Sequence, residues 1–261
     1  EAVSVSYDIH GNMPELQSWS GNISSQLTDV EFSRLPGILH EKLAMPGFSG
    51  AASLNVSTLW QGGIVETASG HISGRNLLFT VGELGVPFSV NSIDADINLQ
   101  HKADSWLLTL DKPLIGIGGE PWDAGRIKAS YSADESSLHI SKVKLSDLRP
   151  VLDSLTSENN IVQLVKDLYP SGNGHNLSLT LTGPVSKPTD FLFKMSVSDG
   201  SVNAYSVYPA ATGLTADISV NKTGGSVVAE GQNSRIVLDR VYENPLSVDE
   251  LQASVSWNRE E

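Results

Sequence analysis

The side chains that most often carry out chemistry are spread thinly along this chain. Its six histidines lie about 30 residues or more apart, at His10, His40, His71, His101, His139 and His175. None of them has the i, i+2 or i, i+4 spacing that places two imidazoles on one face for a metal ion. The chain contains no cysteine, which excludes disulfides and thiolate metal sites. We therefore expect no metal site and no cofactor.

Catalytic motifs are equally weak. The segment Gly47-Phe48-Ser49-Gly50 lacks the Gly-x-Ser-x-Gly frame of a nucleophile elbow and precedes a strand, whereas that motif needs a strand followed by a helix. The glycine-rich run 116–119 precedes no helix that could bind a phosphate at its N-terminus. Asp94 and Asp96 alternate with aliphatic residues, so we expect them on the solvated face of a strand. We conclude that the chain is not an enzyme.

Composition excludes another class of function. The chain has 261 residues and a formal net charge of -13. A nucleic-acid-binding protein needs clustered Lys and Arg to displace the counterions of phosphates, and no such cluster occurs. We expect no nucleic-acid partner.

The dominant pattern is a proline followed by a strand with alternating polarity. After Pro245, apolar Leu251, Ala253, Val255 and Trp257 alternate with polar residues. The same arrangement follows Pro87, at Ile93, Ala95, Ile97 and Leu99, and Pro209, at Leu214, Ala216, Ile218 and Val220. Strict alternation is typical of a strand that is buried on one face.

Similar strands recur about every ten residues, as in a long antiparallel meander. Gly62-Gly63 and Ser73-Gly74 are interpreted as turns, so that 63–69 and 75–81 are predicted as separate strands. Helical spacing predicts short helices at 34–44 and 147–168, the second with Ser146 as a cap. The run of helix, Pro/Gly stop and strand occurs twice, which indicates a repeat with a seam at 146–175.

The alternation also predicts which apolar side chains share a face. We expect one apolar surface made of Leu54, Val56, Leu77, Phe79, Ile97, Leu99, Leu108, Leu110, Leu177, Leu179, Leu181, Phe191, Phe193, Ile218, Val220, Val255 and Trp257. From the residues alone, this surface is either the filled core of a β-sandwich or an open apolar groove.

A succession of segments resembles a known family. Residues 87–97 lead to Trp106 and the strand 106–110, then to Trp122 with Arg126-Ile127, to 143–152, and finally to 241–246 and Trp257. In this order and spacing they resemble the periplasmic region of the YhdP family, in the AsmA-like group that includes TamB. The specific signal is the succession, over most of residues 30–257.

The resemblance implies a Gram-negative envelope protein that is anchored in the inner membrane by a segment outside this chain and crosses the periplasm. It implies a mostly β fold, in which residues 1–261 form one elongated part of a longer protein. The sheet would be antiparallel and curled, with the apolar surface lining a groove for phospholipid moving between inner and outer membranes. Two alternatives stay open, a closed β-sandwich that binds glycan or peptidoglycan, and a structural spacer.

Overall fold

The computed structural model describes residues 2–12, 15–31, 49–81, 86–150, 160–185, 187–206, 209–238 and 242–258. The helix predicted at 34–44 lies outside the described residues. The chain divides into two compact units, Glu1–Ser136 and Ser137–Glu261.

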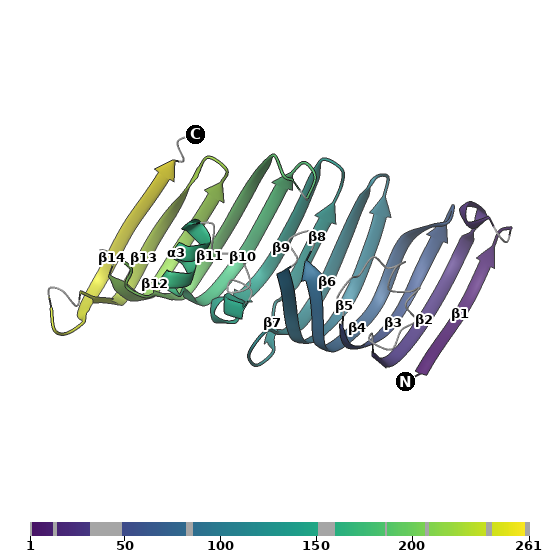
Figure 1. The fold of residues 1–261 in the computed structure, drawn as a ribbon, viewed down its shortest axis with the longest axis horizontal. Coiled ribbons are helices and arrows are strands. Elements are labelled where there is room, and N and C mark those ends of the chain that lie inside the picture. The colour runs from purple at the N-terminus through teal and green to yellow at the C-terminus, as the bar shows by residue number, and fades with distance from the viewer. Residues whose placement is uncertain are drawn as a thin grey trace. The chain divides into compact units, whose positions relative to one another are not determined.

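The described residues form one antiparallel sheet of 14 strands that is not closed, and almost no helix (Figure 1). Strands that are neighbours in the chain are neighbours in the sheet, except that β7 pairs with β6 outside this path. The mostly β, antiparallel fold expected from the sequence is confirmed. A sandwich of two packed sheets is not present among the described strands.

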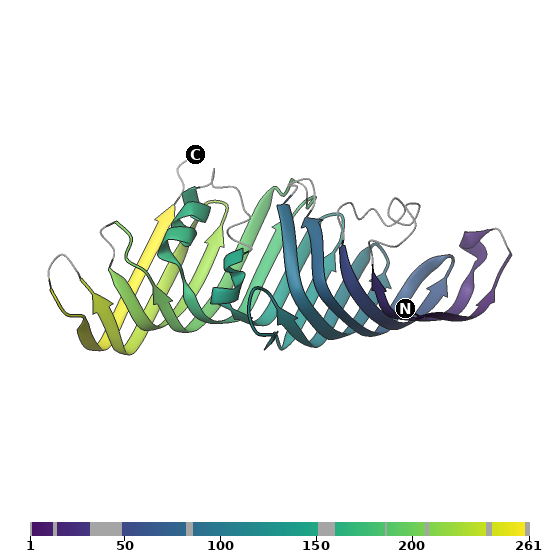
Figure 2. The same ribbon diagram turned by 60° about the horizontal axis from the view of Figure 1, so that its bottom comes forward.

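The first unit is a meander of long strands. Its elements are β1 (Ala2–His10), η1 (Leu16–Ser18), β2 (Ser20–Glu31), β3 (Ser49–Gln61), β4 (Ile64–Val81), β5 (Val86–Lys102), β6 (Ser105–Gly116), β7 (Trp122–Asp123) and β8 (Arg126–Tyr131). Figure 2 shows strands of this unit curving along their length. The next strand, β9 (Glu135–Lys144), contains the boundary between the units.

The second unit adds two short helices to a second meander. They are the 3-10 helix η4 (Leu145–Leu148) and the α-helix α3 (Asn160–Leu168). The strands are β10 (Ser171–Thr182), β11 (Asp190–Val202), β12 (Ala210–Asn221), β13 (Gly224–Val237) and β14 (Leu246–Asn258). The helix α3 lies within the predicted helical region 147–168, and η4 overlaps the start of that region. The predicted cap is wrong, since Lys144 is the N-cap of η4 without a side-chain bond and the Ser146 hydroxyl donates to Asp147 Oδ1 at 3.2 Å.

One predicted turn is also wrong. Ser73 and Gly74 do not separate two strands, because β4 continues through them to Val81. A Cβ atom at Gly74 would lie 2.9 Å from Leu77 Cδ1 and 3.2 Å from Ile93 Cγ2. Glycine is placed here for packing, because neighbouring side chains fill the space of its missing Cβ.

Single residues in the left-handed conformation interrupt many strands. In the first unit they are Asp29, Asn76 and Lys112, with φ of 51°, 50° and 47°. In the second unit Asn176, Asp199 and Asn233 have φ of 51°, 51° and 54°. The pairing register shifts next to Asp29, Asn76, Asn176 and Asp199, which identifies β-bulges. A bulge bends its strand and increases the local twist.

These residues let an apolar face continue where simple alternation would end it. Leu77 lies against the Cβ position of Gly74, three residues earlier, so both belong to one face. Gly174 and Leu177 in β10 are related in the same way. Gly174 pairs with Val197 and Leu179 pairs with Phe193. Val197 and Phe193 lie four residues apart in β11 and share a face, so Gly174, Leu177 and Leu179 also share one. The step of three residues across each interruption replaces the usual step of two.

No helix among the described residues is long and apolar enough to span a membrane.

The bulge in β4 gives a stability prediction. Asn76→Val places a β-branched side chain at a φ of 50°, which should lower the free energy of unfolding by about 1–2 kcal/mol. Asn76→Gly should be tolerated, because glycine adopts positive φ freely. The matched control is Asn55→Val in extended β3. Equal urea midpoints for the two valine variants would contradict the role assigned to Asn76.

Candidate functional site

The first unit carries an apolar face that runs across its strands. Its rows follow directly from the register, since residues paired across antiparallel strands point to the same side. One row runs from Val56 through Gly70 and Ile97 to Leu110 and Ile127. A parallel row contains Ala68, Leu99, Leu108 and Ala129, and Leu54 pairs with Ile72 and Leu27. We call this surface the first apolar face.

The two remaining predicted residues of this unit lie in β4. Leu77 is 7% exposed and pairs with Val90. Phe79 pairs with Phe88 in the same register.

The second unit carries an equivalent surface, the second apolar face. Leu179 pairs with Phe193, which pairs with Val220, which pairs with Gly225 and through it with Trp257. The next row joins Met195, Ile218, Val227 and Val255, while Leu181 pairs with Phe191. Trp257 lies over Gly225, whose missing Cβ would be 2.3 Å from its Cζ2 atom. Within each unit the register thus brings together the side chains that the sequence grouped.

Most of these apolar side chains are only half-buried. Leu54, Ile97, Leu110, Leu179 and Phe193 all keep part of their surface accessible. Val255 is 52% and Trp257 39% exposed. The filled core of a sandwich would bury such residues, because protein interiors are closely packed. Each face therefore offers apolar surface that another molecule can cover.

The opposite face of each unit is mainly polar, although the register also places exposed Leu107 on it in the first unit and exposed Leu192 and Val228 in the second. In the first unit the Ser24 and Ser57 hydroxyls share a hydrogen bond of 2.9 Å, and Arg75 pairs with Asp29 at 2.6 Å. In the second unit the Ser196 hydroxyl donates to Asp217 Oδ1 at 2.6 Å. Solvated polar groups on one side and accessible apolar groups on the other make each unit amphipathic.

On the polar face of the first unit, His71 lies between two carboxylates. Its Nδ1 lies 3.1 Å from Asp96 Oδ1, and its Nε2 lies 3.4 Å from Asp94 Oδ2. The hydrogen bond to Asp96 raises the pKa of His71 above its ordinary value of 6.5; desolvation opposes this shift, and the charge of Asp94 assists it. No group of three or more His, Cys, Asp or Glu side chains in the described ranges could hold a metal ion. His71 and its two carboxylates therefore act as a surface ion-pair cluster.

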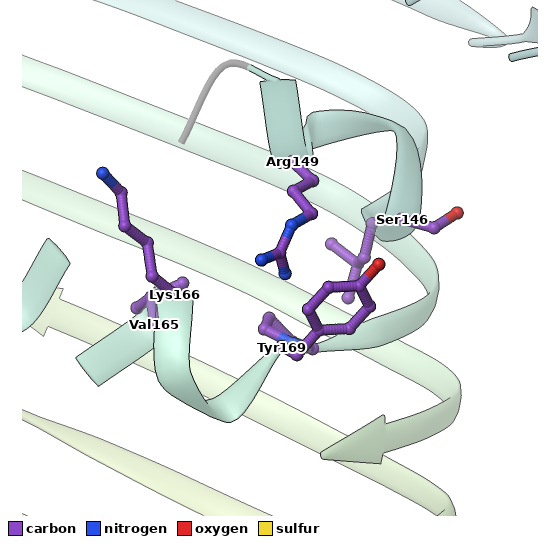
Figure 3. Close-up of a pocket in the computed structure, with 7 residues that line it drawn as sticks. Ser146, Arg149, Val165, Lys166 and Tyr169 are labelled. Carbon is purple, nitrogen blue, oxygen red and sulfur yellow. The ribbon is translucent and has the colours of Figure 1, made fainter. Parts of the chain in front are cut away.

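A small hollow between η4 and the end of α3 is a feature that the sequence did not predict. Its lining residues are Leu145, Ser146, Arg149, Val165, Lys166, Tyr169 and Pro170 (Figure 3). The Arg149 guanidinium carbon lies 3.8 Å from the centroid of the Tyr169 ring. Twenty residues separate this pair in the chain, so no local sequence pattern could have joined them.

The structure is an open antiparallel sheet whose register gathers aliphatic side chains on one face of each unit. This defines a class of amphipathic β proteins. Comparison with known sequences gives the family. The family described as "YhdP protein" matches residues 1–261, so the chain belongs to the YhdP family.

A relative with an assigned activity also matches. The chain is 22% identical over 184 residues to the "Intermembrane phospholipid transporter YhdP" of Escherichia coli strain K12. The match covers 65% of this chain but 14% of the relative, so this chain corresponds to a small part of the relative's length. No solved structure matches the chain.

The His71 cluster predicts a pH dependence. Because the pKa of His71 is raised by folding, its contribution to stability is complete below the unfolded pKa and disappears as pH rises through the folded pKa. Asp96→Asn should lower the folded pKa of His71, as measured by NMR titration of its ring protons. Asp134→Asn, in a distant turn, should leave it unchanged. An unaltered titration in the Asp96 variant would show that the contact has no effect.

Proposed function

We propose that this chain is part of a route along which phospholipid moves between the inner and outer membranes, with acyl chains lying on the two apolar faces. The observation that carries the proposal is the register, which gathers partly exposed aliphatic and aromatic side chains on one side of each unit. Family membership and the named activity of the Escherichia coli relative support the same role. As in the sequence analysis, we place the chain in the periplasm, as part of a protein anchored in the inner membrane outside this chain.

The physics of lipid transfer favours such a surface. Each buried methylene of an acyl chain contributes about 0.8 kcal/mol, so a sixteen-carbon chain resists leaving a bilayer by on the order of 12 kcal/mol. A half-exposed apolar face replaces much of that lost contact without a tight pocket. Many similar, non-directional contacts also let a chain slide, because no single position is strongly preferred.

The amphipathic sheet assigns the two parts of a lipid to different places. Acyl chains lie against the apolar face, and headgroups remain in water at its margin. The predicted lining residues in this proposal are Leu54, Val56, Leu77, Phe79, Ile97, Leu99, Leu108, Leu110, Leu177, Leu179, Leu181, Phe191, Phe193, Ile218, Val220, Val255 and Trp257.

Site-specific labelling tests this assignment. Single cysteines at Ile97, Leu110, Leu181 and Val220 test the apolar faces, and cysteines at their polar-face neighbours Asp96, Thr109, Thr180 and Ser219 are matched controls. In intact cells we expect a phospholipid with a photoactivatable acyl chain to label the first four positions. The four control positions should react only with a water-soluble maleimide. Absence of lipid labelling at all four would overturn the proposal and favour a structural spacer.

Charge placed on an apolar face should block the function. Leu179→Asp or Phe193→Asp should abolish complementation of a deletion strain, because a carboxylate among apolar neighbours is poorly solvated and repels acyl chains. Thr180→Asp, which changes the neighbour of Leu179 on the polar face of β10, should complement normally. Circular dichroism of each purified variant separates loss of folding from loss of transport. Equal behaviour of all three folded variants would contradict the assignment of faces.

A further inference from the structure

Aromatic rings gather at one end of the strands of the first unit, on the side of the first apolar face. Trp106, near the start of β6, pairs with Tyr131, the last residue of β8. Trp106 lies two residues before Leu108, and Tyr131 lies two residues after Ala129, so both rings are on the face that contains Leu108 and Ala129. Trp106 also pairs with His101 in β5, and the two rings stack with their centroids 4.2 Å apart and 24° between their planes.

Trp60 lies at the same end of the sheet. It precedes the last residue of β3, and antiparallel pairing brings the ends of β3 and β8 to the side where β6 begins. Its Nε1 donates a hydrogen bond of 2.8 Å to Thr58 Oγ1. Thr58 pairs with Ala68 on the first apolar face, so this bond holds the indole on that side. We call Trp60, Trp106 and Tyr131 the aromatic margin.

The aromatic margin is accessible, whereas the opposite end of the same face is packed. Tyr131 is 54% exposed, and Trp60 and Trp106 are half-buried. Towards the other end of the strands, Ala95 in β5 is 2% exposed and Ile115 in β6 is 9% exposed. Accessible surface therefore increases from the packed end to the aromatic margin.

Polarity also changes in steps towards this margin. Along β5 the side chains on the apolar face pass from Ile97 and Leu99 to His101, and the strand ends at exposed Lys102. The turn that follows carries exposed Asp104. The order apolar, aromatic, charged is the order found across one half of a membrane, where Trp and Tyr lie between the hydrocarbon and the headgroups. The aromatic margin therefore matches the interfacial part of a phospholipid.

The second unit has the same gradient on its own apolar face. Val197 is 6% exposed and pairs with Gly174 near the start of β10. At the other end of the strands, Phe191 lies at the start of β11 and Trp257, which is 39% exposed, lies near the end of β14. The repetition of a packed end and an aromatic end indicates that the placement of rings in the first unit is not accidental.

We propose that the aromatic margin holds the glycerol and ester region of a phospholipid, with the headgroup in water beside Lys102 and the acyl chains directed along the strands. This inference rests on the proposed function and deepens it, since it states which margin of the face takes the headgroup. The hydrocarbon of one bilayer leaflet is about 15 Å thick and a strand rises about 3.3 Å per residue. An acyl chain that starts at Trp106 therefore covers about five residues, as far as Leu110.

Two phospholipid probes test this orientation on the full-length protein in detergent. One carries a photoactivatable group next to the ester, and the other carries it at the methyl end of the same acyl chain. The labelled residues of β6 are located by mass spectrometry. We expect the ester-proximal probe to label residues 105–108 and the terminal probe to label residues 109–116, because the chain points away from the aromatic margin.

Three variants test the role of the rings. Trp106→Leu/Tyr131→Leu keeps apolar side chains but removes the amphipathic rings, and it should lower ester-proximal labelling of residues 105–108 about threefold. Trp106→Tyr/Tyr131→Trp keeps two rings with a polar edge and should retain the pattern. The matched control is Leu59→Ala/Leu107→Ala, which changes two exposed residues on the polar face of β3 and β6 and should alter neither probe's pattern.

The outcomes separate this inference from the function on which it rests. Labelling of the unaltered protein by neither probe would overturn both. Labelling by both probes at the same residues, or in the reverse order, would overturn the orientation and leave the proposed function in place. An unchanged pattern in the leucine variant, or a lost pattern in the exchange variant or the control, would contradict the role of the rings. If circular dichroism shows that the leucine variant is unfolded, the unaltered protein and the exchange variant decide the question.

Discussion

The structure depends on keeping apolar side chains on one side of an antiparallel ladder over many strands. Alternation alone achieves this in a straight strand, because side chains point to opposite faces with a period of two. These strands are bent and interrupted, and each interruption would move the apolar residues to the polar face. Left-handed residues such as Asn76 and Asn176 provide the extra residue that restores the phase. Bending and amphipathicity are therefore compatible in the same strand.

As a consequence, the two faces of the sheet in each unit differ in polarity. The polar side is solvated and held by short-range contacts such as His71 with Asp96 and Arg75 with Asp29. The apolar side remains half-buried, with exposed positions in β14 such as Val255 and Trp257. A protein rarely leaves such a surface accessible unless something covers it. In the proposed function acyl chains cover this surface, because they need area and no fixed hydrogen-bond partner.

Much of this arrangement could be predicted from the sequence, for reasons that are physical. The pattern Leu177, Leu179, Leu181 has a period of two and predicted a one-faced strand, and Pro209 and Pro245 directly precede β12 and β14. The continuation of β4 through Gly74 was missed, because a glycine that makes room for Leu77 and Ile93 has the same local signature as a turn. The bulge residues were missed because Asn and Asp also occupy ordinary polar positions. The contact between Arg149 and Tyr169 depends on packing between distant segments, which no local period encodes.

The central claim is that phospholipid covers the apolar faces, and native mass spectrometry of the full-length protein extracted from membranes tests it most directly. The account predicts bound masses of phospholipid that are reduced in Leu179→Asp and retained in Thr180→Asp. A folded protein that carries no phospholipid, or that carries it equally in both variants, would contradict the account.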